Sequence, residues 1–120
     1  MSEKITLKDN RDFQRLYRRG RSFVSPVLVT YVLKNKSDNL RYGITTGKKI
    51  GNAVRRSRSR RVIRAAFREL LPEVRNGHDI VFVARGKTPF VKSYVVKEAM
   101  LSHFKKAGII GESKNEKTPD

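Results

Sequence analysis

Apolar residues recur with helical spacing in three stretches of this chain. Each stretch also has signals for its ends, which are a polar residue that can cap the N-terminus or a glycine or proline that stops the helix. In the first stretch, Phe13 and Tyr17 lie four residues apart on one side, and Gly20 ends the helix. The expected amphipathic helices are residues 9–19, the stretch between the N-cap Asn52 and Pro72, and a stretch from Thr88 and Pro89 to about Lys106.

Three other stretches are dense in β-branched and aromatic residues, which is typical of strands. We expect strands at residues 23–33, 40–46 and 79–85, with residues 35–39 forming a polar hairpin loop. The element order is then α-β-β-α-β-α, which predicts an α+β fold with helices packed on a mixed sheet. We expect one domain, residues 1–108, followed by a disordered polar tail, residues 109–120.

The middle helix has an unusual charge pattern. Seven arginines fall between Arg55 and Arg68, and the whole stretch from Lys48 to Arg68 lacks Asp and Glu. Solvated helices normally mix charge signs so that successive turns can pair. Arginine can also donate two parallel hydrogen bonds to phosphate oxygens. At about 100° per residue, one face is apolar and the other basic, with Ser57 in the middle of the basic face. The apolar face holds Ile63, Ala66, Phe67 and Leu70, and the basic face holds Arg60, Arg61, Arg64 and Arg68.

Composition strengthens the case for a polyanionic partner. The 120 residues carry a formal net charge of +17, which fits nucleic acid or an anionic membrane. A membrane surface is the weaker interpretation, because the apolar face of the basic helix is narrow and the chain has no tryptophan. The lack of cysteine excludes disulfides, a thiol nucleophile and zinc-finger ligation, and fits the reducing cytoplasm, where we expect this protein. We find no secretory signal and no apolar run long enough for a membrane span.

Residues 41–68, RYGITTGKKIGNAVRRSRSRRVIRAAFR, resemble the signature region of the bacterial ribonuclease P protein family. That family's pattern is a basic pair, then Gly-Asn-Ala-Val, then an arginine-rich helix. Residues 12–22 and 79–85 are similar to its first helix and its last strand. The resemblance implies a ribosomal-protein-like fold with a left-handed βαβ crossover through the basic helix. It also implies a subunit of a tRNA-processing endoribonuclease, which joins a catalytic RNA and assists the Mg²⁺-dependent removal of the 5′ leader from precursor tRNA.

In such an enzyme the RNA carries the chemistry, so we expect no catalytic or metal-binding side chain in the protein and no obligate protein partner. The resemblance implies a leader-binding cleft between the first helix and the sheet, formed by Phe13, Tyr17, Val29 and Tyr31. Ser57 departs from the family, which usually has Asn at that position. The expected contacts with the catalytic RNA are Lys48, Lys49, Asn52, Arg56, Ser57, Arg58, Arg60, Arg61, Arg64 and Arg68.

Other functions stay open at the level of sequence. One is a small basic ribosomal protein, or another structural RNA-binding protein, of similar fold. A DNA-binding module is another, although only Ser57 and Ser59 among the basic residues could read bases. A protein ribonuclease could use two histidines as acid and base. We expect both His78 and His103 at the surface, which disfavours that role.

Overall fold

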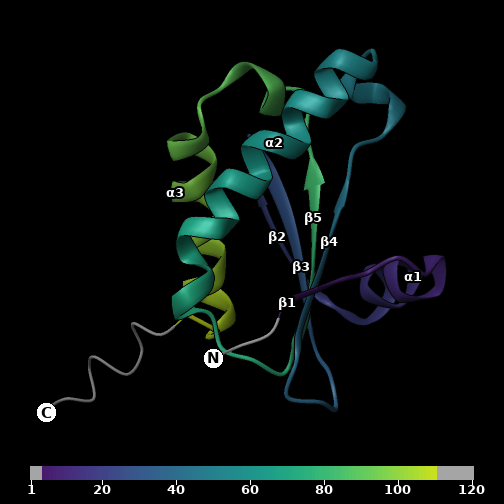
Figure 1. Cartoon of the computed structure of the whole chain (residues 1–120), viewed down its shortest axis with the longest axis vertical. Coiled ribbons are helices and arrows are strands. Elements are labelled where there is room, and N and C mark those ends of the chain that lie inside the picture. Colours follow the sequence, from purple (N-terminus) through teal and green to yellow (C-terminus); the bar gives the residue numbers. More distant parts are fainter. Residues whose placement is uncertain (1–3, 111–120) are drawn as a thin grey trace, which may run out of the picture.

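A computed structural model of the chain describes residues 4–110. In the described part of the chain, α-helices lie on both faces of one sheet (Figure 1). The helices are α1 (Asn10–Arg19), α2 (Ala53–Leu70) and α3 (Ser93–Ala107), and the strands are β1 (Lys4–Thr6), β2 (Arg21–Ser25), β3 (Leu28–Lys34), β4 (Leu40–Thr45) and β5 (His78–Ala84). Single 3-10 turns are η1 (Lys48–Ile50), η2 (Leu71–Glu73) and η3 (Thr88–Phe90). The predicted α+β class is confirmed. None of the helices in this part of the chain is long and apolar enough to cross a membrane.

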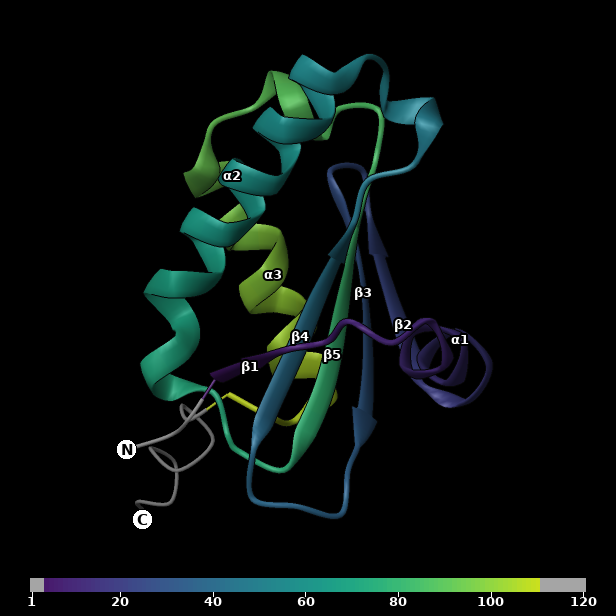
Figure 2. The ribbon, with the colours of Figure 1, turned by 45° about the vertical axis from the view of Figure 1, so that its right-hand side comes forward.

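The five strands form one mixed sheet in the order β1-β4-β5-β3-β2. β4 is parallel to both β1 and β5, and β3 is antiparallel to β5 and β2. The helix α2 is therefore the crossover between two adjacent parallel strands, β4 and β5. Figures 1 and 2 show α2 and α3 on one face of the sheet and α1 on the other. The prediction of a hairpin loop at residues 35–39 is wrong, because β5 lies between the two strands that this loop joins.

Two element boundaries also differ from the prediction. The strand predicted at residues 23–33 is a hairpin of two strands, because Ser25 turns the chain at Pro26. The Ser25 hydroxyl accepts the backbone N–H groups of Val27 and Leu28, at 3.3 and 3.1 Å. The residues expected to open the last helix, Thr88 and Pro89, form η3 instead, and α3 begins at Ser93. The short strand β1 was not predicted.

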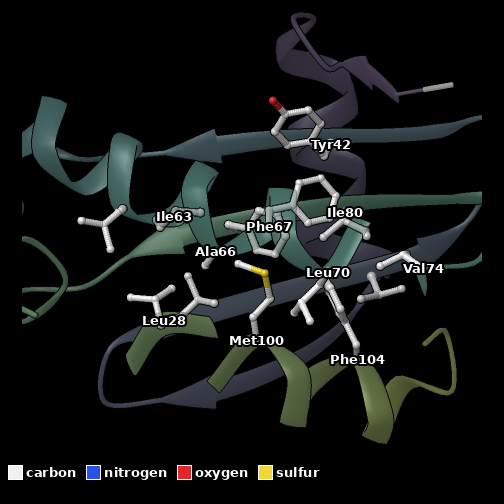
Figure 3. Packing of buried hydrophobic residues seen from close by; sticks show 14 of the residues in the cluster. Leu28, Tyr42, Ile63, Ala66, Phe67, Leu70, Val74, Ile80, Met100 and Phe104 are labelled. Carbon is white, nitrogen blue, oxygen red and sulfur yellow. The ribbon is translucent and has the colours of Figure 1, made fainter. Parts of the chain in front are cut away.

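The core lies between the sheet and the pair α2 and α3 (Figure 3). Phe67 of α2 is at its centre, with ring centroids 5.0 Å from Tyr42, 5.1 Å from Phe82 and 6.2 Å from Phe104. The predicted apolar face of α2 packs into this core, since each of its residues is buried. Aromatic pairs at these separations add about 0.5–1.5 kcal/mol each beyond the area they bury.

The domain extends past the predicted boundary at residue 108. Gly108 ends α3 in the left-handed conformation, with φ 75°, which favours glycine. The next two residues, Ile109 and Ile110, are buried in the core, and Ile110 pairs with Val74 in an isolated β-bridge. They therefore belong to the folded domain and not to a tail. The rest of the predicted disordered tail, residues 111–120, lies outside the described residues.

The expectation that both histidines lie at the surface is wrong for His103. Its side chain is 2% exposed and stacks on Phe23, with ring centroids 6.0 Å apart. Nδ1 lies 2.8 Å from the hydroxyl of the buried Thr30. Burial, and then the positive charge of Lys106, lower the pKa of His103 from 6.5 to about 4. His103 is therefore a neutral core residue at pH 7.

This burial makes the stability of the fold depend on pH. The unfolded chain binds a proton on His103 near pH 6.5, whereas the folded chain does so only near pH 4. The contribution of His103 to the free energy of unfolding is therefore fully present above pH 6.5. As the pH falls towards 4, about 2–3 kcal/mol of this contribution is lost. We expect urea unfolding at several pH values to show this loss in the wild type. His103→Gln, which keeps a polar partner for Thr30, should lack it, and an equal pH dependence in both proteins would contradict the assignment.

Candidate nucleic-acid interface

The helix α2 begins with a positively charged N-terminus. Its predicted N-cap is confirmed, because Asn52 Oδ1 accepts the backbone N–H of Arg55 at 3.0 Å. Gly51 before it has a φ of 127°, a conformation that favours glycine. The exposed basic pair Lys48 and Lys49 forms η1 just upstream, and the first turn of α2 has no acidic residue. Because a helix N-terminus already carries partial positive charge, this end of α2 attracts anions.

The arginines of α2 point in three directions, and the predicted single basic arc is only one of them. Arg61 and Arg68 are exposed opposite the buried stripe, with Arg64 and Ser57 half-buried beside them. A second direction leads to the end of β4, where Arg60 Nη1 donates to Thr46 Oγ1 at 2.8 Å.

The third direction leads to η3. Arg58 Nε donates to the carbonyl of Pro89 at 2.6 Å, and the Arg55 guanidinium lies 5.0 Å from the ring centroid of Phe90. In the described part of the chain, no ion pair joins an α2 arginine to an acidic side chain, since Glu69 pairs with Lys97 instead. Within the described chain, no acidic side chain therefore neutralises the charge of the α2 arginines.

On the opposite face of the sheet, α1 covers part of the strands and leaves a hollow beside them. Phe13 and Tyr17 line this hollow together with Thr45, the last residue of β4, and Thr46, which follows it. The Tyr17 hydroxyl lies 3.0 Å from Thr45 Oγ1. The ring of Phe13 packs where a side chain on Gly43 would clash, at 2.6 Å from an added Cβ. The aromatic side chains are therefore held against the sheet with one side open.

Register places the other two predicted cleft residues on this same face. Tyr31 meets Tyr17 edge to face, with ring centroids 5.1 Å apart. Val29 is two residues along β3 and pairs with the exposed Val24 of β2. The structure thus brings the four predicted residues to one side of the sheet, although only Phe13 and Tyr17 line the hollow itself.

The hollow adjoins the basic helix through one side chain. Thr46 lines the hollow and also accepts the hydrogen bond from Arg60. Sequence reasoning missed Thr45 and Thr46. Alternation along β4 places Thr45 on the α1 side with Gly43, so its position could have been predicted, whereas Thr46 lies beyond the strand and has no such signal.

A buried carboxylate holds α1 to the sheet. Asp79 is 1% exposed and accepts two hydrogen bonds from Arg41, at 2.8 and 2.6 Å, and one from Asn35 at 2.9 Å. Arg15 of α1 reaches the same carboxylate at 3.4 Å and pairs with Asp12 at 2.9 Å. Burial raises the pKa of Asp79, but the hydrogen bonds and charges of its partners outweigh burial and hold the pKa below its usual value.

The two histidines lie on different elements, α3 and β5. His103 is buried among α3 and the sheet, and His78 begins β5 with Nδ1 3.3 Å from the carbonyl of Arg75. Within residues 4–110, no group of three His, Asp or Glu side chains is placed to hold a metal ion. The described site is made of cations, hydroxyls and aromatic rings.

Comparison with known proteins agrees on one family. The family model Ribonuclease P matches residues 1–108. The chain is 40% identical over 121 residues to the ribonuclease P protein component of Clostridium beijerinckii, covering 95% of this chain and 97% of that protein. It is 49% identical over 80 residues to that of Clostridioides difficile, covering 66% and 70%. Among solved structures, the RNase P protein of Staphylococcus aureus has a TM-score of 0.75 at 32% identity, covering 90% of this chain and 98% of that one. The protein from Thermotoga maritima gives 0.74 at 31% identity, covering 84% and 96%.

Proposed function

Because the chain belongs to the ribonuclease P protein family, we propose that it binds the 5′ leader of precursor tRNA within that enzyme while the RNA subunit carries out the cleavage. As a ribonuclease P protein component, it has the ribonuclease P RNA as its partner. The alternative of a ribosomal or other structural RNA-binding protein is not favoured by these comparisons.

The observation that carries the proposal is the junction at Thr46. On one side lies a helix whose arginines have no acidic partner in the described chain, which suits the phosphates of a folded RNA. On the other side lies a hollow with open aromatic rings, which suits unpaired bases. A single strand leaving an RNA bound on α2 would enter this hollow past Arg60.

In this proposal the protein side chains bind and position the substrate. The rings of Phe13 and Tyr17 stack bases of the leader, and Arg60 contacts its backbone near the RNA subunit. The Mg²⁺ ions of the reaction are then bound mainly by the RNA. Positioning of the leader raises the affinity for precursor tRNA over mature tRNA, which has no leader.

Reconstitution tests the proposal. The purified chain and a bacterial ribonuclease P RNA, at low magnesium, are expected to cleave precursor tRNA together where neither does alone. Phe13→Leu fills the space over Gly43 but removes the aromatic face. It should weaken binding of precursor tRNA to the assembled enzyme about tenfold and leave mature tRNA unaffected, since stacking of one base is worth roughly 1–3 kcal/mol.

Tyr94→Leu is the matched control, because Tyr94 is an exposed aromatic residue on α3, away from the hollow. It should leave the preference for precursor tRNA unchanged. Equal losses for precursor and mature tRNA in Phe13→Leu would show that the ring only supports the fold. Cleavage by the protein alone would overturn the assignment of the chemistry to the RNA.

A further inference from the structure

An exposed aromatic ring lies on the other side of α2 from the hollow lined by Phe13 and Tyr17, which we call the leader hollow. Phe90, the last residue of η3, is 65% exposed, although Thr88 and Pro89 in the same turn are buried. Figure 1 shows the connection from β5 to α3, which contains η3, beside the N-terminal half of α2. An apolar ring held this far into solvent is costly to hydrate and is a candidate contact for a partner.

The turn that carries this ring is firmly held. The Thr88 hydroxyl donates to the carbonyl of Val27 at 2.7 Å and accepts the backbone N–H of Arg85 at 2.8 Å. Arg58 donates to the carbonyl of Pro89 at 2.6 Å. A ring on such a turn loses little conformational entropy when it binds a ligand.

The surroundings of the ring are basic. The Arg55 guanidinium lies over Phe90 at 5.0 Å, in a cation–π contact. A groove between α2 and the start of α3 adjoins η3, and its lining contains no acidic residue. The groove is lined by Arg58, Arg61, Val62, Ala65, Lys92 and Ser93. A planar ring and an arginine plane beside cations that have no acidic partner in the described chain are the features that bind an unpaired nucleotide, by stacking on its base and contacting its phosphates.

We propose that Phe90 and this groove, which we call the η3 groove, bind an unpaired nucleotide of the ribonuclease P RNA. The base stacks on Phe90, and the adjacent phosphates lie against Arg58, Arg61 and Lys92. The inference rests on the proposed function but adds a second single-stranded contact, made to the RNA subunit and not to the leader. Arg58 and Arg60 are two residues apart and so point about 160° apart around α2, which means that the helix separates a leader in the leader hollow from the η3 groove.

The test uses full-length Phe90→Ala, Phe90→Leu and Phe90→Trp proteins with a bacterial ribonuclease P RNA at fixed salt. Phe90→Ala and Phe90→Leu should each weaken RNA binding about tenfold, because both lack a ring on which a base can stack. Phe90→Trp should bind within about twofold of the wild type, since it keeps a ring. Because Phe90 is exposed, all three are expected to fold, and thermal unfolding checks this.

Several outcomes would overturn the inference. Wild-type affinity in Phe90→Leu would mean that no base stacks on the ring. A lower melting temperature with unchanged RNA affinity would reduce Phe90 to a support for Arg55. Unchanged affinity for the RNA subunit, with weaker binding of precursor tRNA by the assembled enzyme, would assign the groove to the substrate. Failure of the wild type itself to bind the RNA would instead refute the proposed function, so the two failures are distinguishable.

Discussion

Replacing Arg61, Arg64 and Arg68 with alanine is expected to weaken binding of the ribonuclease P RNA by two to three orders of magnitude. These arginines lie opposite the buried stripe of α2 and form no ion pair within the described chain. Each can donate charge-assisted hydrogen bonds to phosphate, worth roughly 1.5–3 kcal/mol apiece before losses from non-additivity. The three together therefore account for a large part of the binding free energy.

Salt dependence gives a second readout of the same variant. Each phosphate contact releases counterions, so the slope of log affinity against log salt should become shallower by about 2–3 when three contacts are lost. Filter binding between low and moderate salt measures this slope. A slope equal to that of the wild type would mean that the three arginines do not touch the RNA backbone.

The matched control removes the same charge elsewhere. Lys36, Lys105 and Lys106 are exposed and belong to the loop before β4 and to α3, so their replacement by alanine also lowers the net charge by three without changing α2. Its RNA affinity should fall far less than that of the arginine variant. Similar losses in both would make the binding a matter of net charge and not of the α2 face. The arginine variant should also stay folded, because alanine favours helix and the substitutions relieve repulsion between successive turns.

The position of α2 could be predicted from the sequence because the residues that determine it are neighbours in the chain. Asn52 caps it and the apolar stripe ending at Leu70 is buried as predicted. The sheet order was not predictable, because β5 inserts between β3 and β4 through pairings far apart in sequence. β1 has only three residues and pairs with β4 alone, so it leaves almost no pattern in the sequence. The split at Pro26 was missed although proline lacks the N–H that a continuous strand needs there.

His103 was misread although the signal was present. It lies three residues after Met100 and seven after Val96, which puts all three on one side of α3, and all are buried. Lys105 and Lys106 are exposed close by, but Lys106 is only one turn from His103, and its charge helps to lower the pKa of the buried ring. The leader hollow was partly predictable, since the spacing of Phe13 and Tyr17 marks one face. The η3 groove was not, because Phe90 was assigned to a helix and its exposure depends on tertiary packing.

Asp79→Ala is expected to lower the free energy of unfolding by about 3–5 kcal/mol, because it removes the buried counterion of the partly buried Arg41. The carboxylate joins β5 to Arg41 of β4, to Asn35 in the loop and to Arg15 of α1. With total stabilities of about 5–15 kcal/mol for such domains, this loss is a large fraction of the whole. Urea unfolding measures it.

A double-mutant cycle separates this network from a general effect of losing a buried side chain. Arg41→Ala removes the main partner of Asp79, so the two single losses should not add in the double variant. Asp38→Ala, an exposed loop position, should change stability by less than about 0.5 kcal/mol. Because its pKa is lowered in the folded chain, the contribution of Asp79 is present above pH 4 and is lost as the pH falls further. Additive losses, or a difference between wild type and variant that persists at low pH, would contradict the proposed anchoring of α1 and hence of the hollow that it forms.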